Sequence, residues 1–164
     1  MEVKFDNNGY LLPYERLRID LKTFKEQFVD QFDKGSSRHL LYRQYVEYTM
    51  LFQSKVAENF TQWINGSYVT DTENPSDIDL VNLVDYKSVQ GKEELVQREF
   101  MTTGASKKFG IDAYLLILYP EGHKFNSWTK SDLFYWNDWF TKSKMNRSRK
   151  RHPKGYLEIV WGKA

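Results

Sequence analysis

Cysteine is absent from this chain of 164 residues. Without cysteine there can be no disulfide framework and no thiolate metal site, so any metal must be held by oxygen or imidazole ligands. Carboxylate and carbonyl oxygens are the ligands that Mg²⁺ and Mn²⁺ prefer. The composition therefore favours one of these two ions over structural zinc.

Long apolar runs are missing as well. The longest, Ala113 to Tyr119, is far shorter than the roughly 20 residues that a membrane-spanning helix needs. The opening residues, MEVKFDNNGYLLPYERL, lack the basic and then apolar regions of a secretory signal. We therefore expect a cytoplasmic protein that does not contact a membrane.

Several catalytic signatures are also absent. The sequence has no phosphate-binding P-loop, and Ser67 lacks the G-x-S-x-G setting of a serine hydrolase. His39, His123 and His152 are too far apart in the sequence to suggest a metal triad, and each is typical of a surface or helix face. Only His152, which lies in a basic run, could join in phosphate binding.

Net charge is small, at +2, but it is unevenly distributed. Residues 142–154, KSKMNRSRKRHPK, hold seven Lys or Arg and no acidic residue, which leaves 17 basic against 22 acidic residues elsewhere. Such a segment attracts the phosphates of nucleotides or of nucleic acid. The alternative is a mobile, solvated loop, and composition alone leaves both interpretations open.

Aromatic residues, by contrast, are plentiful at 16% of the chain, so most of the rings must lie in the core. The length indicates a single domain over residues 1–164 that buries roughly two thirds of its unfolded surface. The stretch YWNDWF, 135–140, could stack a base, but its three- and four-residue spacing favours a helix that faces the core.

Hydrophobic periodicity predicts two N-terminal helices followed by strands interleaved with helices. The first helix covers about 20–32, with Asp20 as its N-cap, and the second begins at Ser36-Ser37 and ends near Asn59. Further helices are expected at 92–101 and, capped by Ser131, to residue 140, with strands at 63–64, 78–84, 110–119 and 156–161. The expected fold class is α+β, a small mixed β-sheet flanked by helices.

Two aspartates stand one residue apart at the start of an apolar strand. Asp77 and Asp79 flank Ile78, so the period of two places both carboxylates on the same side. Mutual repulsion raises the pKa of one of them unless a divalent cation neutralises the pair. By itself the spacing is more typical of a polar strand start than of a metal site.

Two other features shift the balance toward a site. Gly66-Ser67 lies at the end of the preceding strand, where a glycine lets phosphate approach backbone N–H groups and a serine hydroxyl. Asp112 lies near the beginning of the most apolar strand, where a lone carboxylate is costly. If strands 78–84 and 111–118 are neighbours, Asp112 completes a cluster of three carboxylates suited to two-metal phosphoryl transfer.

These residues resemble the nucleotidyltransferase superfamily related to DNA polymerase beta. The pattern is Gly66-Ser67, then Asp77-Ile78-Asp79-Leu80, then Ile111-Asp112-Ala113, and it covers roughly 61–119. From FDNNGYLLP through GSYVTDTENPSDIDL to YWNDWF and KGYLEIVWG, the chain is also similar to an uncharacterised bacterial family described only as nucleotidyltransferase-like.

The resemblance implies a nucleotidyltransferase-like fold whose core lies at about 61–119. Asp77, Asp79 and Asp112 would be catalytic and would bind Mg²⁺ or Mn²⁺, with Asp112 as general base or orienting group for the acceptor hydroxyl. Gly66 and Ser67 would contact the nucleotide phosphates. The expected nucleotide is an NTP, ATP above others, and the acceptor is a protein, an RNA or a small molecule.

Two departures from the superfamily pattern concern the phosphate grip. Asn65 replaces the usual apolar residue before Gly66, and segment 71–76, DTENPS, lacks the Arg or Lys found in some relatives. A cationic clamp must then come from Lys107 and Lys108 or from the basic segment 142–154. For Lys107 and Lys108 the alternative is an ordinary exposed loop beside Gly104 and Gly110.

Two functions follow as hypotheses. The first is an enzyme that transfers a nucleoside monophosphate from an NTP to a hydroxyl and releases pyrophosphate. The second is a binding module that has kept the fold but lost turnover, acting as an antitoxin-like partner of another protein or as an RNA-binding regulator through 142–154. One scaffold hosts many functions, so the fold does not decide between them.

Overall fold

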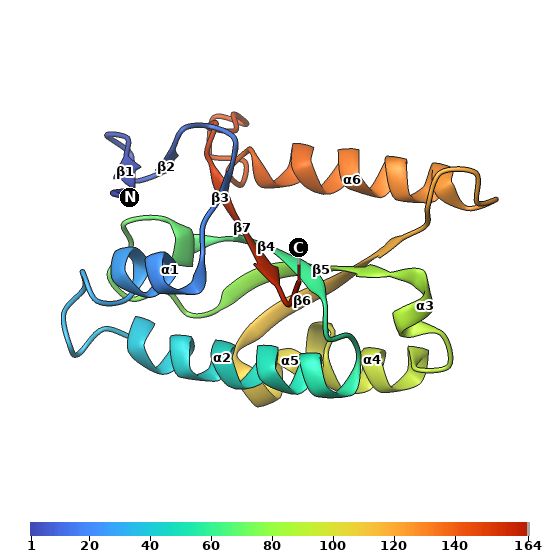
Figure 1. Cartoon of the computed structure of the whole chain (residues 1–164). Coiled ribbons are helices and arrows are strands. Elements are labelled where there is room, and N and C mark those ends of the chain that lie inside the picture. The colour runs from blue at the N-terminus through green and yellow to red at the C-terminus, as the bar shows by residue number, and fades with distance from the viewer. Residues whose placement is uncertain (164) are drawn as a thin grey trace.

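A mixed five-stranded β-sheet forms the centre of the computed structural model, which describes residues 1–163 (Figure 1). Its order is β3 (Arg16–Arg18), β7 (Tyr156–Trp161), β4 (Phe60–Asn65), β5 (Ile78–Asp85) and β6 (Ile111–Leu118). The outer pairs β3–β7 and β5–β6 are parallel, and β4 is antiparallel to both of its neighbours. The expected α+β class with a mixed sheet is thus confirmed.

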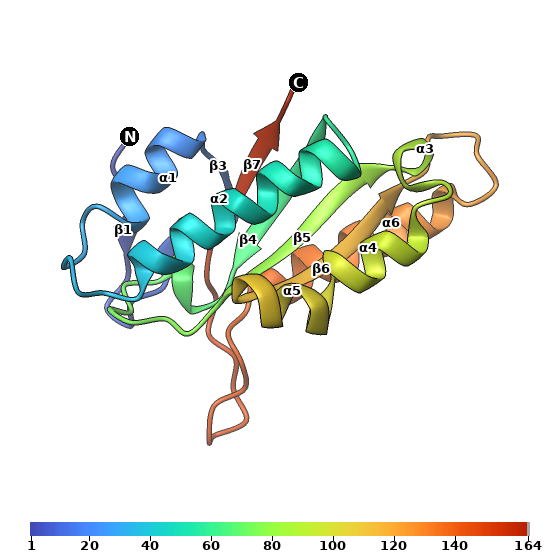
Figure 2. The same ribbon diagram turned by 90° about the horizontal axis from the view of Figure 1, so that it is seen from below.

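Helices cover both faces of this sheet. Figures 1 and 2 show α2 (Arg38–Lys55), α4 (Glu93–Glu99) and α5 (Thr102–Phe109) on one face and α6 (Asn126–Phe140) on the other. The remaining elements are short: α1 (Leu21–Phe28), α3 (Tyr86–Val89), the 3-10 turn η1 (Ser67–Val69), and the hairpin of β1 (Lys4–Phe5) and β2 (Leu11–Leu12). Both expected N-terminal helices are present.

Alternation along β5 divides the core between the two faces. Ile78, Leu80 and Val84 pack in the larger cluster, which contains the buried residues of α1 and α2. Val81 and Leu83 pack in the smaller cluster, which contains Phe140 of α6. Asp79 has the parity of Val81 and Leu83, so its carboxylate lies on the α6 side of the sheet.

Several expected boundaries need correction. The helix expected at 92–101 is α4, which ends at Glu99, and α5 is a further helix that the sequence did not predict; it begins at Thr102, whose positive φ of 41° separates it from α4. Ser131 lies inside α6 rather than at its start, and Ser37 makes no side-chain cap for α2. Asp20, in contrast, caps α1 as expected, since its Oδ1 accepts a hydrogen bond from Thr23 N–H at 2.8 Å.

No helix within residues 1–163 combines the length and the apolar character required to cross a membrane.

Candidate active site

The acidic residues meet in a cleft on the α6 side of the sheet. Strands β5 and β6 are neighbours, which the sequence offered only as a condition, and Asp79 lies directly opposite Asp112 in their register. Asp77 immediately precedes β5, and all three residues line one cleft of about 680 Å³. This volume is in the range of pockets that bind small-molecule ligands and cofactors.

Burial and the repulsion of nearby carboxylates raise the pKa values of Asp77 and Asp79. Burial first, and then the charges of Asp77 and Asp112, raise the pKa of Asp79 to about 6. Burial and the charge of Asp112 also raise the pKa of Asp77, although Lys144 lowers it in part. The Tyr114 hydroxyl donates a long hydrogen bond of 3.4 Å to Asp112 Oδ2. A positive charge placed between Asp77 and Asp79 would therefore stabilise their ionised forms.

Gly66 fits against the Asp79 carboxylate. Its φ of 83° and ψ of −168° lie in a region that is open essentially to glycine alone. A Cβ atom at this position would collide with the carboxylate of Asp79. The glycine therefore allows the chain to turn from β4 into η1, which begins at Ser67, directly beside the acidic residues.

A buried arginine organises the loop that follows. Arg38, at the start of α2, is 0% exposed and donates short hydrogen bonds to four backbone carbonyls and a longer one, of 3.4 Å, to Ser67 O. The acceptors of the short bonds are Phe28 O and Tyr68 O for Nη1, and Thr70 O and Thr72 O for Nη2, at 2.7–2.9 Å. Burial lowers the pKa of Arg38 to about 10, so it remains protonated at neutral pH. A single arginine in a helix gives no sequence signal of this role.

The two serines before Arg38 fix the rest of the same loop. Ser36 Oγ donates to Glu73 O and Ser37 Oγ donates to Pro75 O, each at 2.5 Å. Ser37 makes no side-chain cap for α2, but Ser36 Oγ also accepts a hydrogen bond from Arg38 N–H, at the first residue of the helix, at 3.1 Å. Both hydroxyls hold the backbone that leads to Asp77. The lysine-free 71–76 segment is shaped by α2 rather than by its own charges.

The basic segment forms a hairpin, and the residues at its base line the cleft. Lys142 pairs with Pro153, and Ser143 N–H donates to His152 O at 2.7 Å. At the tip, Asn146 Oδ1 accepts hydrogen bonds from the N–H groups of Ser148 and Lys150, both at 2.9 Å. We call residues 142–154 the basic hairpin, and Figure 2 shows it projecting from the body of the molecule.

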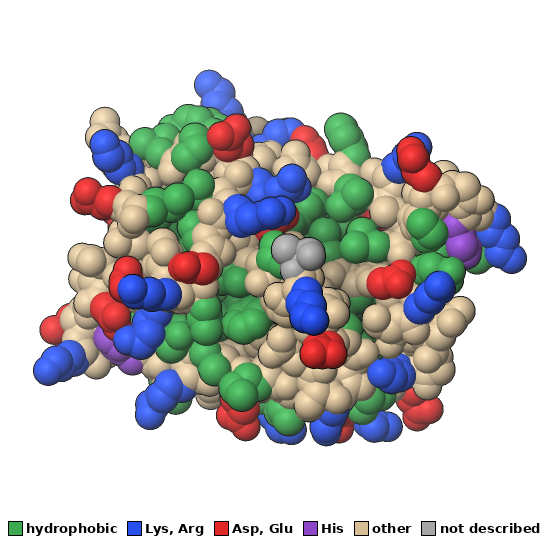
Figure 3. All heavy atoms as spheres, viewed as in Figure 1, with side chains coloured by type: hydrophobic (Ala, Val, Ile, Leu, Met, Phe, Trp, Pro, Cys, Tyr) green, Lys and Arg blue, Asp and Glu red, His purple; other side chains and the backbone are tan. Residues whose placement is uncertain are grey.

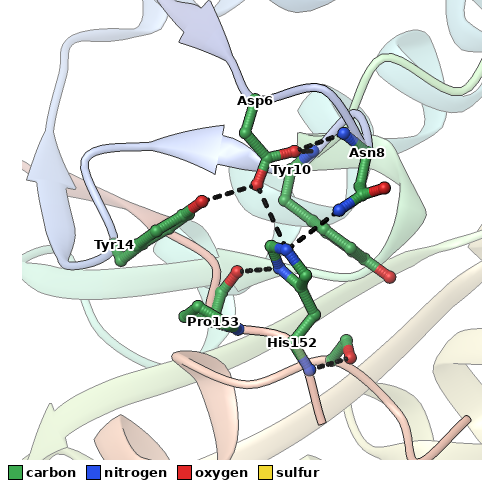
Figure 4. Close-up of polar contacts among 7 residues, drawn as sticks. Asp6, Asn8, Tyr10, Tyr14, His152 and Pro153 are labelled. Atoms are coloured by element: carbon green, nitrogen blue, oxygen red, sulfur yellow. Dashed lines mark hydrogen bonds and ion pairs between the residues drawn. The ribbon is translucent and has the colours of Figure 1, made fainter.

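Contacts to the N-terminal hairpin fasten the base of the basic hairpin (Figure 4). The His152 ring stacks on Tyr10 at a centroid distance of 4.9 Å, and its Nε2 lies 3.0 Å from the Asn8 amide and 3.7 Å from Asp6 Oδ2. His152 Nδ1 lies 2.6 Å from Pro153 O. His152 thus connects the N-terminal hairpin to the basic hairpin. It is not among the residues that line the cleft with Asp77, Asp79 and Asp112.

Lys154 is the most enclosed cation of the cleft. Its side chain is 7% exposed, and within residues 1–163 no carboxylate lies at ion-pair distance from its ammonium group. Burial lowers the pKa of Lys154 to about 8, an effect that Asp79 partly opposes. A buried ammonium without a close partner needs an anion, and the cleft offers the space for one. The sequence indicated the basic segment but not this residue.

Lys107 and Lys108 do not share this location. The structure places both on α5, exposed and outside the set of residues that line the cleft. The cationic residues that do line it all come from the basic hairpin: Lys142, Lys144, Arg151 and Lys154. Of the two sources that the sequence offered for a phosphate clamp, only the hairpin reaches the acidic residues.

Asn65 completes the row of polar residues across the strands. It faces Asp79 in the β4–β5 register, so Asn65, Asp79 and Asp112 lie side by side on three adjacent strands. Asn65 Oδ1 is buried and has no hydrogen-bond partner among the described residues. Such an unpaired acceptor is costly unless a ligand supplies the donor.

The end of α6 supplies an aromatic wall. Trp136 and Phe140 pack into the smaller core cluster, as the sequence favoured for this stretch. Tyr135 and Trp139 also line the cleft but remain 55% and 45% exposed. Core packing therefore accounts for two of the four aromatic rings in the YWNDWF stretch, Trp136 and Phe140.

No group of three or more His, Cys, Asp or Glu side chains in residues 1–163 is arranged to hold a metal ion as the side chains stand. The donors themselves are of the type that Mg²⁺ and Mn²⁺ prefer, and the charge of such an ion would offset the repulsion that, after burial, raises the pKa values of Asp77 and Asp79. The chemistry of the donor set, together with the unpaired Asn65 oxygen, therefore fits a divalent cation.

A protein-family model described as "Family of unknown function (DUF6932)" matches residues 3–160. No curated protein and no solved structure matches the chain. The match covers all of the elements that build the cleft, so the cleft is a feature of the matched region.

Proposed function

The chain belongs to this family of unknown function, and we propose that it is a metal-dependent nucleotidyltransferase. It moves a nucleoside monophosphate from an NTP, ATP above others, to an acceptor hydroxyl and releases pyrophosphate. The observation that carries this proposal is the convergence of Asp77, Asp79 and Asp112 on one cleft with Gly66-Ser67 and the buried, unpaired Lys154. A nucleotidyltransferase-like fold is part of the same proposal.

The acidic residues form the metal-binding part of the site. Asp77, Asp79 and Asp112 would hold Mg²⁺ or Mn²⁺, and all three line the cleft. When bound, the metal would neutralise their charges and act as a Lewis acid on the phosphate oxygens. This neutralisation also explains why the protein maintains three carboxylates in a place where two of them have raised pKa values.

The cationic and glycine-containing parts bind the triphosphate. The Lys154 ammonium offers a charge-assisted contact to a phosphate oxygen, and Lys144 lies near enough to influence the pKa values of Asp77 and Asp79. Gly66 leaves the backbone open for close approach of a phosphate, and Ser67 offers its hydroxyl. Together they hold the α-phosphate beside the carboxylates.

Asp112 is the residue to which we assign activation of the acceptor hydroxyl. Its carboxylate would accept the proton of the acceptor hydroxyl, whose oxygen bonds to the α-phosphorus while the bond to pyrophosphate breaks. Asp112 has one described hydrogen-bond donor, Tyr114, at 3.4 Å. The carboxylate therefore keeps free lone pairs for an incoming hydroxyl.

The test is transfer of label from α-labelled NTPs in the presence of Mg²⁺ or Mn²⁺, with a cell lysate as the source of acceptors. An Asp77→Asn/Asp79→Asn variant is compared with a matched surface variant, Asp85→Asn/Glu94→Gln, whose acidic residues are exposed and lie outside the cleft. We expect transfer by the wild type and the surface variant but not by the cleft variant. Equal transfer by all three proteins, or none by the wild type with any NTP, would refute the proposal.

A second candidate is a module that binds the nucleotide without turning it over. The observation in its favour is that, within residues 1–163, no three His, Cys, Asp or Glu side chains are already arranged to hold a metal ion. The same assay separates the two, because this candidate binds ATP through Lys154 yet transfers no label. Loss of ATP affinity in Lys154→Met, without any transfer by the wild type, would identify it.

A further inference from the structure

We propose that the acceptor is a single-stranded nucleic acid, held by the basic hairpin and by the exposed aromatic face of α6. This inference rests on the proposed function, since it names the acceptor class of the same site. The strand would lie along Tyr135 and Trp139 with its backbone on the hairpin, and its terminal hydroxyl would reach the acidic residues.

The aromatic side chains of α6 form a stacking platform. Tyr135 and Trp139 are one helical turn apart, and their rings are within 7° of parallel at a centroid distance of 6.5 Å. Neither ring is required for the core, which α6 contacts through Leu133, Trp136 and Phe140. Flat, exposed, parallel rings beside a cleft are suited to stack on unpaired bases, each contact being worth about 1–3 kcal/mol.

The basic hairpin continues this platform. The Arg151 guanidinium lies over the Trp139 ring at 4.9 Å from its centroid, so the aromatic and cationic surfaces are continuous. Arg147, Arg149 and Lys150 are exposed at the tip. On the face in Figure 3, acidic and basic side chains are intermixed, whereas the hairpin has seven basic residues and no acidic one.

The geometry favours a polymer over a mononucleotide. Lys144 and Lys154 already line the cleft, whereas Arg147 and Lys150 do not; they belong to the hairpin that projects from the body of the molecule (Figure 2). Charges that lie beyond the nucleotide are useful to a ligand with phosphates along its length. An acidic polypeptide would satisfy the charges but not the parallel rings, and duplex bases are already stacked on one another.

The test is fluorescence anisotropy with a labelled 12-nucleotide strand of mixed sequence, as RNA and as DNA, without NTP and over a range of salt concentrations. An Arg147→Ala/Lys150→Ala tip variant should bind about tenfold more weakly, with a salt slope lower by about 1.4, or 0.7 for each lost phosphate contact. The charge-matched control is Lys22→Ala/Lys34→Ala, which removes two exposed lysines outside the cleft. It should behave like the wild type.

A separate variant tests whether bases stack on the exposed rings of α6. Trp139→Ala should weaken binding about tenfold without changing the salt slope. The control is Phe134→Ala, which removes a ring of the same helix that is 76% exposed and does not line the cleft. Binding of RNA, DNA or both with these dependences supports the proposal and identifies the sugar.

Three results would overturn the proposal: no binding of either strand by the wild type, a tip variant that matches its lysine control, or a Trp139→Ala variant that matches Phe134→Ala. Displacement of the strand by poly-glutamate, combined with indifference to Trp139→Ala, would point instead to an acidic protein partner. Because no NTP is present, the outcome is independent of transfer. Label transfer to another acceptor, with no strand binding, would leave the proposed function standing and reject this inference.

Discussion

Replacing Lys154 with methionine should make the protein more stable and its cleft less able to bind ATP. Lys154 is 7% exposed and has no carboxylate at ion-pair distance in residues 1–163, so its charge is held without a close partner. Methionine retains an unbranched apolar chain of similar length and removes the charge. Lys154→Met therefore separates the packing of this side chain from its electrostatic role.

The magnitude follows from the pKa of Lys154. A pKa of about 8 in the folded chain, against 10.5 for the ordinary side chain, corresponds to a penalty of about 3 kcal/mol. Below pH 8 both the folded and the unfolded chain carry the charge, so the full penalty is present at pH 7. Between pH 8 and 10.5 the folded chain releases its proton first, and the penalty disappears. The variant should thus be up to about 3 kcal/mol more stable at pH 7, and about equal to the wild type at pH 10.5.

Urea denaturation at several pH values measures the stability difference, and calorimetric titration with ATP measures binding. Loss of a charge-assisted hydrogen bond of about 1.5–3 kcal/mol predicts ATP affinity about 10- to 100-fold lower in Lys154→Met. Lys107→Met, on exposed α5, is the matched control and should change neither quantity. A Lys154→Met variant that is less stable than the wild type at pH 7, or that binds ATP equally well, would refute the reasoning.

Two further substitutions test how the cleft is shaped. Arg38→Lys keeps a charge but loses the planar fork that serves four carbonyls, so unfolding in urea should show a loss of about 3 kcal/mol or more; a loss below about 1 kcal/mol would contradict the assigned role. Gly66→Ala should lose about 1–3 kcal/mol to backbone strain, and label transfer as well, because its Cβ displaces Asp79. Gly91→Ala is the control: Gly91 also has a positive φ, of 75°, but a Cβ there meets nothing within 4 Å. Equal stability and transfer in the two glycine variants would show that contact with Asp79 does not matter.

The elements that the sequence predicted best are those whose periodicity is complete within one segment. The side chains of β5 alternate between the two core clusters, and α1 begins at a clear aspartate cap. Both elements can therefore be predicted without knowledge of their neighbours. The same alternation places Asp79 on one side of the sheet. Parallel pairing of β5 with β6, which the sequence offered only as a condition, then brings Asp112 opposite it.

Elements that depend on distant partners could not be predicted. Strand β3 has three residues and no clear pattern, and it exists because it pairs in parallel with β7, about 140 residues later. Helix α5 contains Gly104, which sequence propensity disfavours; in the structure it lies so close to the Arg98 carbonyl that a Cβ would collide with it. In both cases tertiary contact decides what local preference does not.

The residues of the candidate site also differ in whether one segment of the sequence is enough to predict them. The acidic residues and Gly66-Ser67 carry their spacing within the sequence, whereas the buried cation Lys154 belongs to a segment whose composition is equally typical of a solvated loop. Its enclosure results from the Lys142–Pro153 pairing and from the attachment of His152 to the N-terminal hairpin. Arg38 gives no signal at all, because its acceptors are backbone carbonyls that become neighbours only on folding.

The most direct test of the proposed chemistry compares ATP labelled at the α-phosphate with ATP labelled at the γ-phosphate in parallel reactions with Mg²⁺ or Mn²⁺. Transfer of a nucleoside monophosphate predicts that the α-label appears on the acceptor and the γ-label in pyrophosphate. Both products should disappear in Asp112→Asn. Appearance of the γ-label on the acceptor would indicate phosphoryl rather than nucleotidyl transfer, and undiminished products in Asp112→Asn would contradict the role given to the three carboxylates.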